Sequence, residues 1–532
     1  MTSGRRSLAF LGALAAALTL GHSARAGVRL VGPGDDLQAA LNAARPGDVL
    51  LLQAGASFAG NYVLPAFAAT ADDKYVTVRS SAEDGPGSGR RVTPEAAAQL
   101  PKIVSPNTQP AIRTAPGAHH WQLVLLEISA SRDGTGDIVQ LGDGSSVQRQ
   151  LSDVPHHLVI DRCYIHGDPA SAQKRGVALN SGDTRLVNSW ISEVKQVGQD
   201  SQAIAGWNGP GPFTITNNLL SAAGQGFMLG GADPSIPGLV PTGVVFAGNV
   251  VTRPLDWRNS RWQVKNLLEL KNAREVTIED NVFENNWRGA QAGNAILFTP
   301  RNQDGHSPWA TVEAVTFRRN VVRHVAAALT IVGHDSPNPS GVLRGLEITD
   351  NLFYDVDGRA WGGNGDFALI GDGPEAVVVE HNTVLQTGNI ISAYGGSASQ
   401  PTPIPGFVFR ANLVRHNAFG VHGNDRGVGN DTLTAYFPGV VFKDNVVAGG
   451  SAAVYPAGNY FPSSADFEQW FADPANGNFR VNAATAGRSF PPGGGADIDL
   501  VQAGWRAAQA GVWNVDRERV TPERPVKKRR PE

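Results

Sequence analysis

A phrase of about eight residues recurs through most of the chain. It consists of three or four alternating apolar residues, two polar residues, an asparagine and two more apolar residues. The clear copies read FTITNNLL, VVFAGNVV, VTIEDNVF, VTFRRNVV, LEITDNLF, VVVEHNTV, FVFRANLV and VVFKDNVV, with the asparagine at positions 218, 249, 281, 320, 351, 382, 412 and 445. Successive asparagines are 31, 32, 39, 31, 31, 30 and 33 residues apart. A fixed spacing of this kind indicates a repeat architecture.

Each phrase predicts a strand, a tight turn and a second strand. Apolar residues at every second position are typical of a strand with one buried face. Asparagine tolerates the left-handed backbone conformation of tight turns, so we expect the turn to be made at the asparagine itself. Asparagines at the same place in successive coils would stack into a ladder of amide hydrogen bonds. Two earlier segments are weaker copies, LVIDRCYI with Cys163 in the asparagine position and RLVNSWIS.

A further short apolar segment precedes each phrase, as in 267–270 and 295–298. The repeats are rich in β-branched residues and lack long amphipathic helices, which argues against a helical solenoid. A propeller blade would need a longer repeat with four strands. The pattern therefore predicts an all-β fold, a parallel β-helix of about a dozen coils in which neighbouring coils complete each other's sheets.

The two ends of the chain differ from the repeats. Residues 1–26 carry an Arg pair, an apolar run and an A-x-A site, which predicts a signal peptide. Residues 35–45 have apolar side chains at helical spacing and predict a helix that caps the open end of the rod. We assign 27–450 to the β-helix domain with this cap, 451–515 to a C-terminal cap region and 516–532 to a disordered charged tail.

The composition of the chain excludes several classes of structure and binding partner. The chain has 532 residues, a net charge of −3 and one cysteine, so an intramolecular disulfide framework is excluded. The near-balance of charge argues against nucleic acid as a partner. After the signal peptide, no stretch is apolar enough to span a membrane. We expect a monomer that works in the periplasm or outside a bacterial cell.

The opening GDDLQAALNAARPGDVLLLQAG and the asparagine-turn coils resemble secreted bacterial right-handed parallel β-helix proteins of the pectin-lyase-like superfamily. The resemblance covers roughly residues 28–450. It implies a right-handed β-helix and an extracellular polysaccharide as ligand. The superfamily includes polysaccharide lyases, glycoside hydrolases, epimerases, esterases and tailspikes, and the fold does not choose among them. The N-T-D, D-D, G-H-G and R-I-K motifs of its pectin hydrolases are not present as a set, and neither is a clear pectate-lyase calcium cluster.

Long departures from the repeat predict loops at 230–241, at 253–263 and between Asn281 and Asn320. The strands between these loops should lie side by side, with their outward side chains in one strip. The strip would hold the candidate catalytic residues Lys271, Arg301, Glu269, Asp233 and His334, the candidate substrate-binding residues Trp207, Asn208, Gln202 and Asp335, and the candidate metal ligand Asp200.

This mixture suits two reactions on a polysaccharide. In β-elimination, Arg301 or a calcium ion would neutralise a uronate carboxylate while Lys271 removes the adjacent proton. In hydrolysis, Glu269 would act with a second carboxylate, Asp233 or Asp335. A cluster of acidic residues could hold calcium through oxygen ligands. The alternative is a non-catalytic glycan-binding or cell-surface β-helix, in which the same charges form surface ion pairs.

Overall fold

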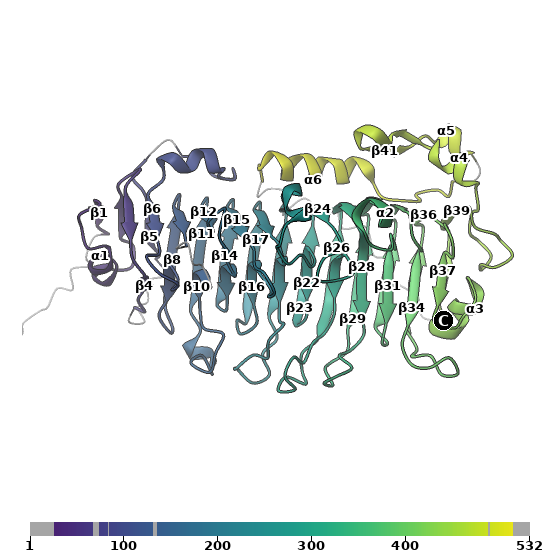
Figure 1. Cartoon of the computed structure of the whole chain (residues 1–532), viewed down its shortest axis with the longest axis horizontal. Coiled ribbons are helices and arrows are strands. Elements are labelled where there is room, and N and C mark those ends of the chain that lie inside the picture. The colour runs from purple at the N-terminus through teal and green to yellow at the C-terminus, as the bar shows by residue number, and fades with distance from the viewer. Residues whose placement is uncertain (1–25, 68–73, 83–84, 131–135, 488–489, 514–532) are drawn as a thin grey trace, which may run out of the picture.

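The structure is a computed structural model that describes residues 26–67, 74–82, 85–130, 136–487 and 490–513. The predicted disordered tail and all but the last residue of the predicted signal peptide lie outside the described residues. The described chain forms a rod of stacked coils, a right-handed parallel β-helix, which confirms the all-β fold (Figure 1). Among the described residues, no helix combines the length and apolar character needed to cross a membrane.

Three long parallel sheets form the sides of the rod. Sheet A has fourteen strands: β1 (Val28–Val31), β2 (Val49–Leu52), β5 (Val76–Ser80), β8 (His119–Val124), β11 (His156–Asp161), β14 (Gly182–Val187), β17 (Gly211–Thr216), β20 (Thr242–Ala247), β23 (Ala273–Glu279), β26 (Val312–Arg318), β29 (Arg344–Thr349), β32 (Glu375–Glu380), β35 (Val408–Arg410) and β38 (Val441–Lys443). Sheet B has thirteen: β3 (Ser57–Ala59), β6 (Lys102–Val104), β9 (Glu127–Ser129), β12 (Tyr164–His166), β15 (Trp190–Val194), β18 (Leu219–Ala222), β21 (Val250–Thr252), β24 (Val282–Asn286), β27 (Val321–Val325), β30 (Leu352–Val356), β33 (Thr383–Gln386), β36 (Leu413–Arg415) and β39 (Val446–Ala448). Sheet C has twelve: β4 (Tyr62–Leu64), β7 (Ile112–Thr114), β10 (Asp137–Leu141), β13 (Arg175–Leu179), β16 (Gln202–Gly206), β19 (Gln225–Leu229), β22 (Leu268–Leu270), β25 (Asn294–Phe298), β28 (Ala327–Val332), β31 (Ala368–Gly371), β34 (Ile391–Tyr394) and β37 (Val421–Gly423).

Each coil runs from sheet A to sheet B to sheet C and returns to sheet A one strand further along. The apolar positions of the repeat point into the rod and form one continuous core, as alternation of side chains along a strand requires. Phenylalanine rings from sheets A and B stack on one another in this core: the ring of Phe317 on β26 stacks on those of Phe283 on β24 and Phe353 on β30. The repeat thus encodes the core of the rod directly.

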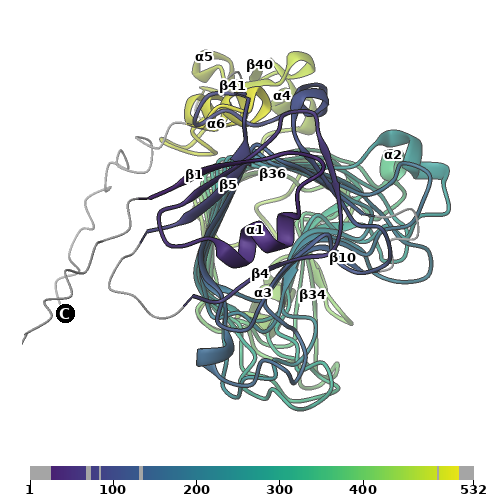
Figure 2. The same ribbon diagram turned by 90° about the vertical axis from the view of Figure 1, so that its left-hand side faces the viewer.

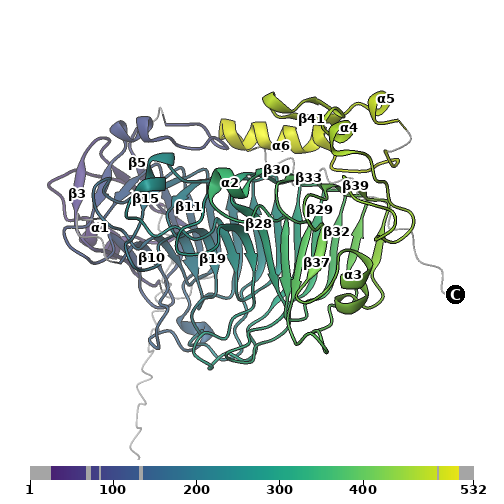
Figure 3. The same cartoon turned by 45° about the vertical axis from the view of Figure 1, so that its right-hand side comes forward.

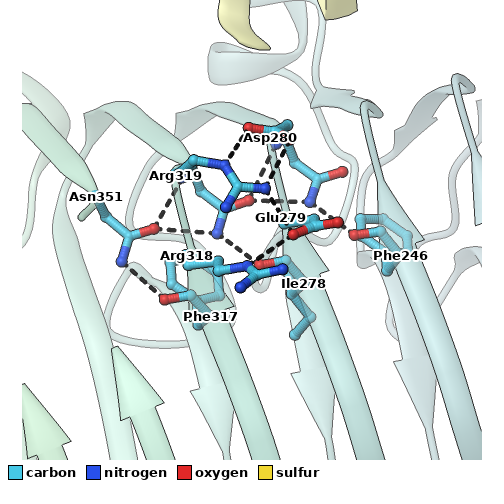
Figure 4. A network of polar contacts seen from close by, with 10 residues as sticks. Phe246, Ile278, Glu279, Asp280, Phe317, Arg318, Arg319 and Asn351 are labelled. Carbon is cyan, nitrogen blue, oxygen red and sulfur yellow. Dashed lines mark hydrogen bonds and ion pairs between the residues drawn. The ribbon is translucent and has the colours of Figure 1, made fainter. Parts of the chain in front are cut away.

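The predicted asparagine ladder lies at the turn from sheet A to sheet B. Asn320 Nδ2 donates to Ile278 O at 2.9 Å and to Asn351 Oδ1 at 3.1 Å, and its own Oδ1 accepts from Asn281. Figure 4 shows the equivalent bond of the next coil, from Asn351 Nδ2 to Phe317 O at 2.9 Å. The left-handed residue is the one before each asparagine, not the asparagine as expected; φ is 52° at Arg319. The reason is that the asparagine side chain must point inward to reach the next coil, so the preceding residue makes the turn. Towards the N-terminus, Ser189 and buried Cys163 continue the ladder in place of asparagine.

Helices close both ends of the rod. α1 (Leu37–Ala43) begins after Asp36, whose side chain accepts from Ala39 N at 2.9 Å, and it buries Leu37, Ala40 and Leu41 against the main core. Seen along the rod, α1 lies across the opening at the N-terminal end (Figure 2). At the other end, α3 (Asn430–Tyr436) packs beside β37. The turns between sheets contain four short helices: α2 (Gly358–Trp361), η1 (Pro94–Gln99), η2 (Leu151–Asp153) and η3 (Leu255–Asn259).

The chain after β39 turns back along the side of the rod. It contains α4 (Ser464–Glu468), a hairpin of β40 (Phe471–Asp473) and β41 (Asn478–Val481) with η4 (Pro474–Asn476), α5 (Ala483–Ala486) and α6 (Ile498–Ala510). These elements lie over sheet B, and α6 runs parallel to the rod axis (Figure 1). At its far end the segment bonds the N-terminal coils, through Trp513 N to Gly89 O at 3.0 Å. The segment therefore covers a sheet face, whereas α3 closes the end of the rod.

Candidate functional site on the outer face of sheet C

The predicted strip lies on the outer face of sheet C. Every third strand of this sheet from β10 onward, namely β10, β19, β28 and β37, is labelled in Figure 3. In the view along the rod, α2 and neighbouring B-to-C turns lie at one edge of the sheet, and the long C-to-A turns lie at the other (Figure 2). The predicted loop 253–263 belongs to the first edge, and the predicted loop 230–241 belongs to the second.

A hydrogen-bonded row crosses four neighbouring strands of this face. Asp137, Arg175, Gln202 and Gln225 are register partners on β10, β13, β16 and β19. Arg175 donates to Asp137 Oδ1 at 2.6 Å and to Gln202 Oε1 at 3.2 Å. Gln202 Nε2 donates to Gln225 Oε1 at 3.2 Å. Gln202, predicted to bind substrate, is only 2% exposed and holds the row together.

The row ends at Glu269 on β22. Its carboxylate accepts from Gln225 Nε2 at 3.2 Å and from Asn266 Nδ2 at 3.3 Å, and it forms an ion pair with Lys271 Nζ at 3.0 Å. Glu269 is 2% exposed, whereas the Lys271 side chain is 20% exposed. A buried carboxylate with three donors is satisfied and fixed in position. Lys271 is therefore the member of the pair that can meet a ligand.

Arg301 lies in the next coil, directly beside Lys271. Its backbone N–H donates to Lys271 O at 2.9 Å. Its guanidinium pairs with Asp335 Oδ1 at 2.8 Å, and the other oxygen of Asp335 accepts from Asn302 N at 3.0 Å. Asp335 is buried and holds both the Arg301 guanidinium and the backbone of Asn302 in place. One third of the Arg301 side chain remains exposed. Lys271 and Arg301 are thus two adjacent, accessible cations on this face.

Two predicted residues have structural contacts that occupy their polar atoms. Asn208 is fully buried; its amide donates to Asp143 O and Gln148 O and accepts from Ile236 N. These hydrogen bonds connect the turn at Asn208 to the chain at 143–148 and to Ile236, and the side chain does not reach the surface. Its side chain is occupied in fixing the C-to-A turns, and the expected contact of Asn208 with substrate stays a prediction.

Asp233 is likewise engaged with a loop. Its carboxylate accepts from Ser307 Oγ at 2.6 Å, His306 N at 2.8 Å and Asp304 N at 3.1 Å. Burial opposes ionisation of Asp233, but these hydrogen bonds outweigh it and hold the pKa below its ordinary value. A carboxyl in this setting stays ionised and cannot act as a general acid at neutral pH.

Trp207 lies at the edge of the row as predicted and is partly exposed. Its indole Nε1 donates to Gly144 O at 2.9 Å, and the Arg175 guanidinium lies 4.9 Å from the ring centroid. Next to it is a cavity of about 180 Å³ whose lining includes Arg113, Gln140 and Gln148. Arg175 is itself buried, so the Trp207 ring and the cavity are the surfaces here that face a ligand lying along the sheet.

The two remaining predicted residues, Asp200 and His334, lie on opposite sides of the row. Asp200 pairs with Lys265 Nζ at 2.6 Å and accepts from Gln263 Nε2 at 3.1 Å, on the B-to-C side of the row. His334 lies on the other side, near Asp372 and Tyr394. Burial raises the pKa of Asp372, although His334 and Tyr394 act in the opposite direction. Burial, together with the Asp372 charge, raises the pKa of Tyr394 to about 12.

The expected cluster of acidic residues does not form. Asp200, Asp233, Glu269 and Asp335 each have their own partners, as described above, and within the described residues no three His, Cys, Asp or Glu side chains are placed to hold one metal ion. Calcium prefers six to eight oxygen ligands. The carboxylates present on this face therefore do not fit a calcium site.

Several site residues were not found from the sequence. Asp137, Arg175, Gln225, Lys265 and Asn266 all belong to the row or border it. Their alignment depends on the register of sheet C, which varies with loop length between coils. Counting from the inward apolar residue of each strand would have found Arg175 and Gln225, because they are register partners of Gln202.

The sequence matches no protein-family model and no curated protein. Among solved structures, the chain is similar to the PL6 family alginate lyase AlyGC, with 13% identity, a TM-score of 0.50 and coverage of 82% of this chain and 53% of AlyGC. It is also similar to a mannuronic acid specific polysaccharide family 6 lyase from human gut microbiota, with 13% identity, a TM-score of 0.48 and coverage of 81% and 88%. A third is the catalytic unit of a thermostable GH87 α-1,3-glucanase from Streptomyces thermodiastaticus, with 16% identity, a TM-score of 0.45 and coverage of 80% and 69%. The chain spans about half the length of AlyGC, and at this identity the likeness shows a shared fold alone.

Proposed function

We propose that the protein is a secreted bacterial enzyme of the pectin-lyase-like superfamily that cleaves an acidic polysaccharide by β-elimination. The observation that carries the proposal is the pair of accessible cations, Lys271 and Arg301, held side by side by buried carboxylates on the outer face of sheet C. A uronate-containing chain supplies the complementary charge. The polar row and Trp207 extend the same surface on the N-terminal side of this pair.

The roles follow from exposure and charge. Arg301 neutralises the uronate carboxylate, which acidifies the proton on C5, and Lys271 removes that proton. The bond from C4 to the glycosidic oxygen then breaks, a double bond forms between C4 and C5, and the departing oxygen takes a proton from water to become a hydroxyl of the released chain. Glu269 Oε1 holds Lys271 Nζ at 3.0 Å, so substrate has to separate this ion pair before Lys271 can reach the C5 proton.

Hydrolysis by a carboxylate pair is less well supported. It would need Asp233 or Asp335 as the partner of Glu269. Asp233 is bound to the 304–307 backbone, and Asp335 is bound to Arg301 and Asn302. Every oxygen of these two carboxylates already accepts a hydrogen bond that fixes a loop, so elimination is the reaction that this arrangement favours.

The test is a screen of the purified mature protein against acidic and neutral polysaccharides, beginning with alginate, for which the similar AlyGC is named. Two readouts run together, the ultraviolet absorbance of unsaturated uronates and the release of reducing ends. We expect both with an acidic polysaccharide. Release of reducing ends without ultraviolet absorbance would contradict elimination. If neither signal is detected but the protein is retained on a polysaccharide gel, the protein is a non-catalytic binding protein.

Variants of Lys271 test its role. Lys271→Arg keeps the positive charge beside Glu269 but cannot give up its proton. We expect Lys271→Arg and Lys271→Met to lower kcat alike, by on the order of 100-fold or more. The control is Lys443→Met, which removes an exposed lysine from sheet A. Full activity of Lys271→Arg would show that Lys271 supplies charge and that the base is another group.

A further inference from the structure

A second polar group lies on the outer face of sheet C, near the C-terminal end of the rod. Glu269, Leu297, Thr330, Leu369, Ser392 and His422 are register partners on six successive strands from β22 to β37. They form one straight row, whose two ends are five strand spacings apart, or about 24 Å. The side chains between the ends carry no charge. Ser392 and His422 therefore mark a separate patch in line with the Lys271 site.

Asp366 holds this patch in place. It is 3% exposed, and it accepts from Ser392 Oγ at 2.7 Å and from Asn389 N at 2.7 Å. His422 Nε2 lies 3.0 Å from Ser392 Oγ and 3.2 Å from Asn389 Nδ2. Ser392, Asn389 and His422 are all partly exposed. The buried carboxylate thus fixes the Ser392 side chain and the Asn389 backbone, and His422 is held through its contacts with these two residues.

The order of these contacts differs from that of a serine hydrolase. In such an enzyme the carboxylate orients the imidazole, and the imidazole takes the serine proton. Here Asp366 bonds Ser392 itself, and the serine hydroxyl has one proton to donate. Asn389 Nδ2 also points at His422 Nε2, because Asn389 Oδ1 accepts from Phe419 N. The geometry indicates a fixed hydrogen-bonding surface rather than an activated nucleophile.

An exposed aromatic ring borders the patch. Phe419 is 55% exposed, and its ring centroid lies 5.6 Å from that of His422. Its backbone bond to Asn389 fixes it beside the polar side chains. An exposed ring next to several hydrogen-bonding groups suits a pyranose, whose apolar face stacks on the ring while its hydroxyls reach the polar atoms.

We propose that Phe419, Ser392, Asn389 and His422 form a second glycan-binding site, the distal patch, which holds the chain on which the Lys271 site acts. The inference rests on the proposed function for the identity of that chain. The patch carries neither lysine nor arginine, so it recognises sugar hydroxyls and a ring face rather than a uronate carboxylate. A polysaccharide that spans both sites binds more tightly than an oligosaccharide too short to bridge them.

The experiment compares long polysaccharide with short oligosaccharides in wild type and Phe419→Ala. We expect Phe419→Ala to raise KM for the polymer about fivefold and to leave kcat and the turnover of short oligosaccharides unchanged, since stacking on one ring contributes about 1 kcal/mol. Ser392→Ala should act in the same direction. The matched control is Leu500→Ala, which shortens a similarly exposed apolar side chain on α6. Equal KM values for Phe419→Ala and the control would overturn the distal patch while leaving the lyase proposal intact.

Affinity electrophoresis in gels that contain the polysaccharide separates the two proposals. If wild type is inactive but retarded, loss of retardation in Phe419→Ala supports the patch and rejects the enzyme. Retardation that is unchanged in Phe419→Ala rejects the patch, and so does a wild type that neither binds nor cleaves any polysaccharide. Covalent labelling of Ser392 by a fluorophosphonate would also overturn the binding role, because it would show an activated nucleophile.

Discussion

Lys271 Nζ lies 3.0 Å from Glu269 Oε1, and the two residues are two apart on one face of sheet C. The carboxylate is almost completely buried, whereas the amine is partly exposed. Glu269 also receives hydrogen bonds from Gln225 and Asn266, so it is anchored from two coils. In the proposed reaction Glu269 is a positioning residue, and Lys271 is the group that meets substrate.

Glu269→Gln tests this division of roles. The change keeps the shape of the side chain but removes the charge that orients Lys271. We expect kcat to fall on the order of 100-fold, as for a misplaced catalytic group, with a smaller change in KM. We expect the free energy of unfolding to fall by about 1–3 kcal/mol, from weakened hydrogen bonds to a formerly charged group. Kinetics and urea unfolding measure the two effects.

The control for Glu269→Gln is Glu347→Gln, the same change at an exposed position on sheet A. It should leave both quantities close to wild type. In the double variant Glu269→Gln with Lys271→Met, the loss of kcat should be no larger than in Lys271→Met alone, because the two residues act as a unit. Additive losses would show that Glu269 acts independently of Lys271.

The asparagine ladder predicts a large loss of stability at a single position. Asn320→Ala removes the acceptor for Asn281 and the donor to Ile278 O and Asn351, all inside the rod. Leaving such buried groups unpaired costs on the order of 3 kcal/mol in the free energy of unfolding. Asn424→Ala, at an exposed turn, should change it by less than about 0.5 kcal/mol. Similar urea midpoints for the two variants would contradict a structural role for the ladder.

The four histidines at the start of β8 and β11 predict a dependence of stability on pH. His156 stacks on His119, and its Nδ1 lies 2.6 Å from Nδ1 of His157. Burial, and then the nearby charges of His157, His119 and His120, lower the pKa of His156, while Asp183 acts in the opposite direction. The folded state thus binds fewer protons than the unfolded state, in which histidine has a pKa of about 6.5. Stability from this group is complete above that pH and is lost as the pH falls below it.

His156→Phe keeps an aromatic ring in the stack and removes the titration. We expect its urea midpoint to change less between pH 7.5 and pH 5 than the midpoint of wild type. The comparison variant is His381→Phe, at a histidine outside this stack that bonds Gly493 O. If His156→Phe and wild type show the same pH dependence, the stacked histidines do not set it.

The fold was predictable because one repeat encodes it many times. The period-two pattern fixes which side chains enter the core, and the asparagine spacing fixes the length of each coil. The backbone conformation at the turn was predicted at the wrong residue, since the ladder needs Asn320 to point inward and Arg319 takes the left-handed conformation. A side-chain preference seen in isolation could not reveal this tertiary constraint.

The site was predictable only where it follows the repeat. Glu269, Lys271 and Arg301 are brought together because β22 and β25 are consecutive strands of one sheet. The contacts of Asp233 were not predictable, because they depend on how a long turn folds back from residues 304–307. The catalytic role expected of His334 within the strip stays a prediction, and its neighbours Asp372 and Tyr394 come from later coils, which the sequence pattern did not single out.

The last prediction concerns the C-terminal helix α6, which packs on the outside of the asparagine turns. A Cβ atom at Gly504 would lie 2.8 Å from Asp280 Oδ1 and 3.1 Å from Asp280 Cβ. Asp280 cannot easily move away, because Arg319 holds its carboxylate with hydrogen bonds of 2.9 and 3.1 Å (Figure 4).

Gly504→Leu raises the helix propensity of α6 but prevents the close approach of α6 to Asp280, so we expect the helix to detach at a cost of about 1–3 kcal/mol. Limited proteolysis should then cleave within 498–513 faster than in wild type. Arg506→Leu places the same side chain at an exposed position of α6 and should be cleaved at the wild-type rate. Equal protection of both variants would show that α6 does not depend on this contact to cover sheet B.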